Sequence, residues 1–205
     1  MKENNIELRI LEVAEKEFLL KGYAGARTVY IAEKVGVSHS MLHYYYRTKK
    51  ALFNKIFEAK INQLVDFIIE AFNQPHVSFF DRIEIGIVKS FDFFVQNPNL
   101  PRFIINEMTV NPNCKYIYTE IVPIIERSIK GMKEEMADLE KQGHIEKIEI
   151  SDLILDIISM NVFVFIVPAC IQRSIVNFSI SQEEFLKHRR KENVEIIMHR
   201  LKKQN

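Results

Sequence analysis

Residues 28–50 read TVYIAEKVGVSHSMLHYYYRTKK, and this stretch decides the fold. Apolar residues recur at helical spacing on both sides of Gly36, which predicts two short helices over residues 28–35 and 38–45. Glycine permits a sharp turn, and a serine such as Ser38 is a preferred helix cap. The side chains expected to fill the seam between the helices are Ile31, Val37 and Leu42. This pattern predicts a helix-turn-helix, a motif whose second helix enters the major groove of DNA.

The second of these helices has an unusual predicted surface. Leu42 and Tyr46 are four residues apart and are expected to face inward. The other side chains are those that form hydrogen bonds, namely His39, Ser40, His43, Tyr44 and Tyr45. Cations that can meet phosphates follow at Arg47, Lys49 and Lys50. Base edges are read by donors and acceptors while phosphate contacts hold the register, so this surface favours DNA binding.

Charge adds little to this argument. Residues 1–50 hold nine Lys/Arg and six Asp/Glu, a net charge of +3, and the remaining residues hold 19 and 21, a net charge of −2. A net positive N-terminal segment followed by a net negative remainder is consistent with phosphate contacts made by residues 1–50. Chance asymmetry of a few charges explains the difference equally well.

The rest of the chain keeps a helical period and has no strand pattern. Further helices are predicted over residues 4–21, 49–72, 79–95, 100–110, 114–141, 152–173 and 181–202. Gly22 is expected to end the first helix in the left-handed conformation, Pro168 is expected to kink the sixth, and Ser181 with Glu184 forms a predicted capping box. We therefore expect an all-α protein with a helix-turn-helix domain at residues 1–50 and a larger helical bundle at residues 51–205.

Length and composition restrict the protein class. The 205 residues suit one or two domains with a real core. The apolar run 153–171 is interrupted by polar residues, so it predicts a buried helix rather than a membrane span. Cys114 and Cys170 show no metal-ligand spacing, and the chain opens on a polar stretch, so we expect a reducing, cytoplasmic location. Buried inert thiols are favoured over a redox role for the two cysteines.

Residues 6–53 resemble the DNA-binding domain of the tetracycline-repressor (TetR) family of bacterial regulators. The residues that carry the resemblance are Gly22-Tyr23, Ile31-Ala32, Gly36-Val37-Ser38, Leu42, Tyr44-Tyr45-Tyr46, Lys49 and Leu52. The resemblance implies that His39, Ser40 and Met41 face base edges. It implies that His43, Tyr44, Tyr45 and Lys49 hold phosphates or adjacent bases. Thr28 and Ser38, at the starts of the two helices, complete the predicted DNA-binding residues.

Three positions depart from the family pattern. Ala26 stands where a helix-capping threonine is usual, so Thr28 is expected to cap a shifted helix instead. Ser40 replaces a frequent glycine, and His43 replaces a frequent tyrosine. These departures concern individual contacts and the DNA sequence that is read, and they leave the module as a whole intact.

The resemblance also implies a homodimer that binds a palindromic operator on double-stranded DNA and pairs through its last two long helices. It implies that a small effector binds the C-terminal bundle and controls a regulator that is usually a repressor. Most of the C-terminal aromatic residues are expected in the core, and some around an apolar effector pocket. The candidate effector-binding residues are Phe94, Phe103, Glu107, Asn161, Phe165 and Cys170.

Other functions have weaker support. The sequence has no Cys-x-x-Cys pair and no phosphate-binding glycine loop, so we expect no enzymatic activity, no cofactor and no metal site. Asp156 and Asn161 suit either the effector pocket or the dimer interface. The main alternative is a helical adaptor whose head binds a protein instead of DNA.

Overall fold

The computed structural model describes residues 2–111, 115–167 and 181–203. The regular elements of these residues are helices, apart from one isolated antiparallel bridge between Ile145 and Lys202. This confirms the predicted all-α class. The chain divides into two compact units, one formed by Met1–Leu64 with Arg102–Tyr116 and the other by Val65–Pro101 with Ile117–Asn205. Residues 51–64 thus pack with the N-terminal helices, beyond the predicted domain limit at residue 50.

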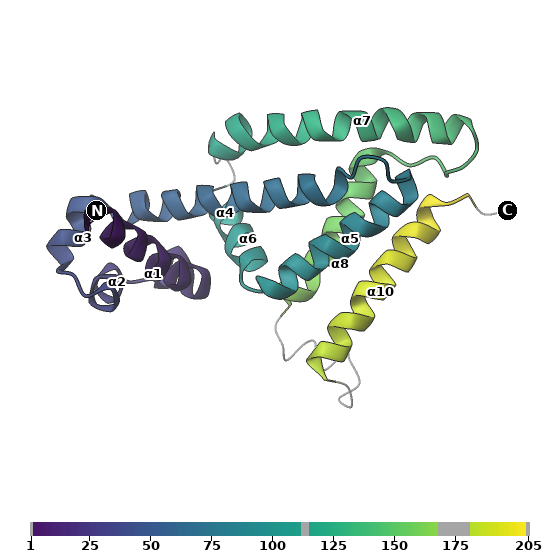
Figure 1. The fold of residues 1–205 in the computed structure, drawn as a ribbon. Helices are drawn as coiled ribbons and strands as arrows, with labels where there is room; N and C mark the ends of the chain where they lie inside the picture. The colour runs from purple at the N-terminus through teal and green to yellow at the C-terminus, as the bar shows by residue number, and fades with distance from the viewer. Residues whose placement is uncertain (1, 112–114, 168–180, 204–205) are drawn as a thin grey trace. The chain divides into compact units, whose positions relative to one another are not determined.

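The first unit contains the predicted helix-turn-helix (Figure 1). Its elements are α1 (Lys2–Gly25), α2 (Thr28–Val35), α3 (His39–Tyr45), the first part of α4 (Lys49–Phe72) and most of α6 (Leu100–Val110). Gly22 interrupts α1 with a positive φ of 67°, but its ψ of 179° is extended. The predicted stop is therefore confirmed, and the predicted left-handed conformation is wrong.

Aromatic packing joins the helices of the first unit. The Phe53 ring of α4 lies 5.1 Å from Phe18 of α1, edge to face, and 5.5 Å from Phe103 of α6. Phe57 lies 6.0 Å from the same Phe103 ring. Aromatic pairs at these separations stabilise beyond the area that they bury. The start of α4 thus has α1 on one side and α6 on another.

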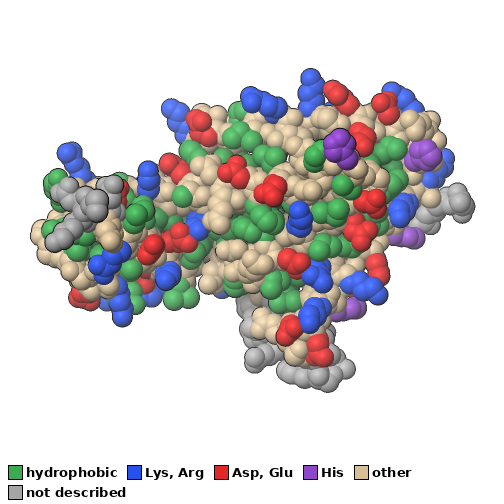
Figure 2. All heavy atoms as spheres, in the orientation of Figure 1, with side chains coloured by type: hydrophobic (Ala, Val, Ile, Leu, Met, Phe, Trp, Pro, Cys, Tyr) green, Lys and Arg blue, Asp and Glu red, His purple; other side chains and the backbone are tan. Residues whose placement is uncertain are grey.

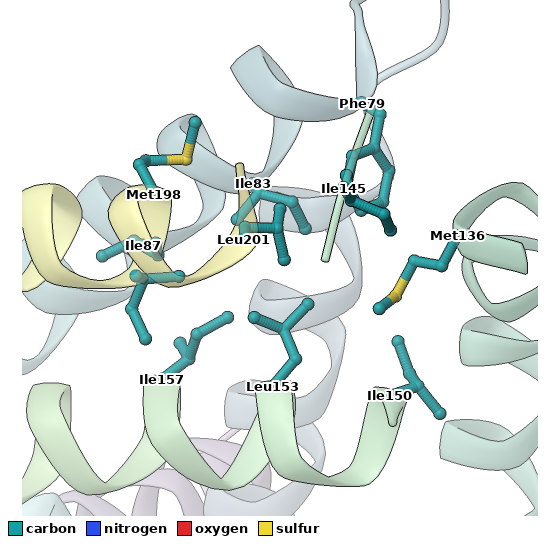
Figure 3. Packing of buried hydrophobic residues seen from close by; sticks show 11 residues of the cluster. Phe79, Ile83, Ile87, Met136, Ile145, Ile150, Leu153, Ile157, Met198 and Leu201 are labelled. Carbon is teal, nitrogen blue, oxygen red and sulfur yellow. The ribbon is translucent and has the colours of Figure 1, made fainter. Parts of the chain in front are cut away.

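The second unit is built around α5 (Phe79–Gln96), which packs against α8 (Ile150–Ile166) and α10 (Gln182–Leu201). A further helix, α7 (Val122–Lys141), packs against α8. Figure 3 shows side chains of the four helices and of Ile145 pointing into one apolar cluster. The cluster consists of Phe79, Ile83, Ile87, Met136, Ile145, Ile150, Leu153, Ile157, Ile197, Met198 and Leu201. The buried apolar surface of this cluster is the main stabilising contribution to the second unit.

Serine caps begin two helices of the second unit. The Ser78 hydroxyl accepts a hydrogen bond from the Asp81 amide at the start of α5. At the start of α10, the Ser181 hydroxyl accepts from the Glu184 amide, and the Glu184 carboxylate accepts from the Ser181 amide. The predicted capping box is confirmed.

The predicted helix over residues 114–141 is confirmed from residue 115 to Lys141, with one local departure from the α-helical hydrogen-bond pattern. Residues 115–116 are already helical, and residues Ile117–Ile121 form a π-helix, η1, that leads into α7 at Val122. The cause is Pro123, which lacks an amide hydrogen and whose ring clashes with the carbonyl four residues earlier. The predicted apolar stripe is only partly buried, because Ile125 is exposed while Ile121 and Met136 are covered. The predicted helix over residues 152–173 is described as far as Ile166, and Pro168 lies outside the described residues.

The outer surface of α7 carries both charges. Figure 2 shows acidic and basic side chains interspersed along this helix. A mixed surface of this kind favours solubility and does not attract one sign of ligand.

Candidate nucleic-acid interface

The turn between α2 and α3 depends on Gly36. This residue is left-handed, with φ 79° and ψ 34°, and its amide donates to the carbonyl of Ala32 over 3.0 Å. A left-handed residue with a 5→1 bond of this kind is a standard helix ending. The Val37 amide bonds to the same Ala32 carbonyl. The backbone hydrogen bonds of Gly36 and Val37 to Ala32 therefore determine the change of direction between the two helices.

Packing then holds α3 against α2. The seam buries Ile31 and Ala32 of α2 and Leu42 of α3, as predicted. Val37, in the turn between the two helices, is half-buried. Ser38 caps α3, because its hydroxyl accepts from the Met41 amide over 3.1 Å. Burial of this seam leaves the opposite face of α3 in solvent.

The exposed face of α3 is the predicted hydrogen-bonding face. The exposed side chains are His39, Ser40, Met41, His43 and Tyr44. Tyr44 is 78% exposed, and its ring meets the half-buried Tyr45 edge to face at 5.5 Å. Tyr46 is buried, which confirms its predicted inward position. The face therefore offers hydroxyl and imidazole groups with no acidic side chain among them.

Two hydrogen bonds join α1 to the helix-turn-helix. Arg9 donates to the Val35 carbonyl at the end of α2 over 2.7 Å, and the Tyr46 hydroxyl donates to Glu7 over 3.2 Å. Burial, followed by the charge and the hydrogen bond of Glu7, raises the pKa of Tyr46 to about 12. The phenol therefore stays protonated and holds its bond to α1 at neutral pH.

Polar contacts link α2 and α3 on the exposed side of the helix-turn-helix. The Thr28 hydroxyl of α2 lies 3.1 Å from Nε2 of His39, whose ring meets that of His43 at 4.4 Å. Nδ1 of His43 lies 3.2 Å from the Arg47 carbonyl. The expectation that Thr28 caps α2 is wrong, since the cap position is Arg27, without a side-chain cap bond. The predicted residues Thr28, His39 and His43 are instead joined to one another.

Two histidines of α3 have a spacing that was not recognised in the sequence. His39 and His43 are four residues apart, the spacing of metal-binding histidine pairs on helices, although no metal site was predicted. Among the described residues, no group of three or more His, Cys, Asp or Glu side chains is placed to hold an ion. Any ion at this pair would therefore have two protein ligands.

Basic side chains next to the motif lie on tyrosine rings. Lys49 lies 4.8 Å from the centre of the Tyr23 ring, and Lys21 lies 4.7 Å from that of Tyr30. These cation–π contacts hold the ammonium groups in place, together with an ion pair of 2.8 Å from Lys21 to the buried Glu17. Tyr23 was named as part of the family signature and Tyr30 was not named, and neither was predicted as an interface residue. Tyrosines near lysines at a helix end are the signal that could have indicated them.

Lys50 differs from Lys49. Its ammonium group donates to Glu107 over 2.9 Å, so the cation expected to meet phosphate is committed to a carboxylate. Glu107 is itself buried in the first unit. The Lys49 ammonium group donates instead to the Ala24 carbonyl over 3.4 Å, and its phosphate role stays a prediction.

The predicted effector residues fall into two groups. Phe94, Asn161 and Phe165 belong to the second unit, where the Phe94 and Phe165 rings lie 6.0 Å apart. Phe103 and Glu107 belong to the first unit. Cys170 lies outside the described residues, as does Cys114. The effector site as a whole stays a prediction.

Asn161 is part of a buried polar network in the second unit. Its amide donates to Ser90 over 2.7 Å and to the Ile87 carbonyl over 3.0 Å, and its carbonyl accepts from Asn193 over 2.9 Å. Asn193 also donates to the Met160 carbonyl. Because buried polar groups need partners, this network connects α5, α8 and α10 at a defined register.

None of the helices that the structure describes is both long and apolar enough to cross a bilayer. Residues 10–56 match the family described as bacterial regulatory proteins of the tetR family. The uncharacterized HTH-type transcriptional regulator YdgC of Bacillus subtilis is 21% identical over 138 residues, which are 64% of this chain and 68% of YdgC.

Solved structures of regulators share the fold over nearly the whole chain. A tetR-family regulatory protein from Rhodococcus RHA1 superposes with a TM-score of 0.72 at 18% identity, covering 98% of each chain. A TetR-family transcription regulator from Marinobacter aquaeolei VT8 has a TM-score of 0.63 at 15% identity and covers 100% of each chain. Together with the helix-turn-helix and the exposed face of α3, the match over residues 10–56 identifies this segment as a DNA-binding domain of the tetR-family type, and the solved structures show that the chain shares the fold of these regulators over nearly its whole length.

Proposed function

We propose that the protein acts as a homodimeric repressor that binds a palindromic operator and leaves it when a small molecule binds. The observation that carries this proposal is the exposed hydrogen-bonding face of α3 opposite the buried seam with α2. In this proposal His39, Ser40 and Met41 contact base edges. His43, Tyr44, Tyr45 and Lys49 contact phosphates or adjacent bases, with Thr28 and Ser38 beside them. Such contacts require chromosomal DNA, so the proposed place of action is the cytoplasm.

Dimerisation through α8 and α10 is supported by exposed apolar side chains. On α8, Leu155 is 60% and Phe163 66% exposed, and Ile158 lies exposed between them. Ile196 is a further exposed apolar residue on α10. A helix face that exposes several large apolar side chains is typical of a protein–protein interface. A two-fold dimer offers two reading helices, which suits half-sites about 34 Å apart, or one turn of DNA.

Effector binding is proposed for the aromatic part of the second unit. The Phe165 ring lies 5.6 Å from Phe91 and 6.0 Å from Phe94, and the buried amide of Asn161 belongs to the same unit. Apolar walls with a few polar groups are typical of small-molecule sites. A hundredfold loss of operator binding requires the effector to prefer the off-DNA form by about 2.7 kcal/mol.

The experiment that tests this function is band-shift titration with the DNA upstream of the gene that encodes the protein. Selection of binders from random duplex DNA identifies any other operator. We expect retention of a palindrome at low salt, and its release by a fraction of a small-molecule extract from cells. Absence of sequence-specific retention at every salt concentration would overturn the proposal and favour an adaptor whose head binds a protein.

A further inference from the structure

Two imidazoles lie one turn apart on the exposed face of α3. The rings of His39 and His43 have their centres 4.4 Å apart, at an interplanar angle of 85°. Both residues are exposed, while Leu42 between them faces the seam. Residues four apart on a helix share a face, so both rings are available to one small ligand.

Hydrogen bonds orient both rings. Nδ1 of His43 lies 3.2 Å from the Arg47 carbonyl, and because a carbonyl only accepts, this nitrogen carries the proton. The Nε2 lone pair of His43 is then free to bind. Metal-binding histidines commonly donate their other ring nitrogen to a carbonyl in this way. Nε2 of His39 lies 3.1 Å from the Thr28 hydroxyl, and in the tautomer in which Nε2 donates to that hydroxyl, Nδ1 is the second ligand atom.

We propose that His39 and His43 form a two-imidazole site for a divalent transition-metal ion, and that an ion held there competes with DNA for α3. The competition rests on the proposed function, whereas the metal site itself does not. Imidazole nitrogen suits Cu²⁺, Ni²⁺ and Zn²⁺, and Cu²⁺ binds tightest in that series. No third His, Cys, Asp or Glu from the described parts of the chain joins the pair, so water completes the coordination.

The metal site is tested without DNA. Cu²⁺ is titrated calorimetrically into the untagged protein and into the His39→Ala and His43→Ala variants. Electron paramagnetic resonance counts the nitrogen ligands. We expect two imidazole nitrogens in the wild type, and a loss of affinity of about a hundredfold in each variant, because each removes one of two linked ligands. The matched control is His144→Ala, an exposed histidine of the second unit, which should bind Cu²⁺ as the wild type does.

Unchanged affinity in both variants, or a spectrum with a single nitrogen ligand, would overturn the site. Both substitutions are at exposed positions outside the seam, and an unchanged melting temperature would show that the variants fold. Copper binding by a protein that retains no duplex DNA would leave the site intact and overturn the proposed function instead.

Competition is then measured by fluorescence anisotropy on the selected operator. Saturating Cu²⁺ should weaken operator binding by the wild type about tenfold or more. The operator affinity of His43→Ala should be the same with and without Cu²⁺. This comparison also controls for an effect of copper bound to the DNA. Equal operator affinity of the wild type with and without bound Cu²⁺ would overturn the competition.

Discussion

Lys50 and Glu107 lie 57 residues apart in the sequence and form an ion pair of 2.9 Å between α4 and α6. The glutamate is only 7% exposed, and the lysine ammonium group also lies 5.0 Å from the centre of the Phe53 ring. The pair fixes α6 to the helix that directly follows the reading motif. It does so inside the first compact unit.

Replacing Lys50 by alanine should reduce the free energy of unfolding by about 2 kcal/mol, because it leaves a buried carboxylate without its cation. The measurement is urea unfolding followed by circular dichroism. Lys50→Ala combined with Glu107→Gln should recover part of the loss. Lys130→Ala, at an exposed lysine of α7, is the matched control and should unfold as the wild type does. A Lys50→Ala variant of wild-type stability would contradict the importance of this pair.

Lys49→Ala should weaken operator binding at all sequences alike and lower the slope of log affinity against log salt by about one, since one phosphate contact is lost. The measurement is anisotropy titration across several salt concentrations. Lys130→Ala again serves as the control. A salt slope equal to that of the wild type would remove Lys49 from the proposed phosphate contacts.

Alkaline pH should loosen the support of the reading helix. The pKa of Tyr46 is raised from 10.0 to about 12, so the folded state holds the phenol proton more tightly than the unfolded state does. Its contribution to stability is complete below pH 10 and is lost as the pH rises through about 12. We expect the melting temperature of Tyr46→Phe to fall less steeply over this range than that of the wild type. Tyr44→Phe, at an exposed tyrosine, should follow the wild-type curve, and identical curves for all three proteins would contradict the assignment.

Much of the reading motif could be predicted from sequence because its signals are local. Gly36 and Ser38 act on amides within a few residues, so the bounds of α2 and α3 follow from their own neighbourhood. Pro123 is also local, but the apolar period around it masked its effect on η1. The apolar period alone does not reveal how a single proline changes the local hydrogen-bond pattern of a helix.

Other features could not be predicted because their partners are distant in sequence. Nothing in the sequence around Lys50 indicates that Glu107 binds it. Likewise, Thr28 was expected to cap its own helix, and only the packing of α2 against α3 brings its hydroxyl to His39. The effector residues were chosen by type, and Phe103 proves to pack on Phe53 and Phe57.

Asn161→Ala should cost about 3 kcal/mol of unfolding free energy, because it removes the buried hydrogen bonds that Asn161 forms with Ser90, the Ile87 carbonyl and Asn193. Thermal and urea unfolding provide the measurement. Asn54→Ala, at an exposed asparagine of α4, is the control for the loss of an amide. A loss as small as that of the control would mean that water replaces the missing bonds.

Phe163→Glu should convert the proposed dimer to a monomer, because it places a charge on the exposed apolar face of α8. Light scattering after gel filtration gives the mass. The variant should also lose its preference for a full palindrome over a half-site. Val110→Glu alters an equally exposed apolar residue of α6 and should leave the mass unchanged. A dimeric Phe163→Glu protein would place the interface elsewhere.

The buried network of Ser90, Asn161 and Asn193 also limits how this protein can evolve. Each member satisfies another, so a change to an apolar residue at one position strands a polar group at the next. Homologues should therefore keep all three polar residues or replace them together, and intermediates with one replacement should be rare. Covariation among these three positions would mark the homologues that share the same α5–α8–α10 register.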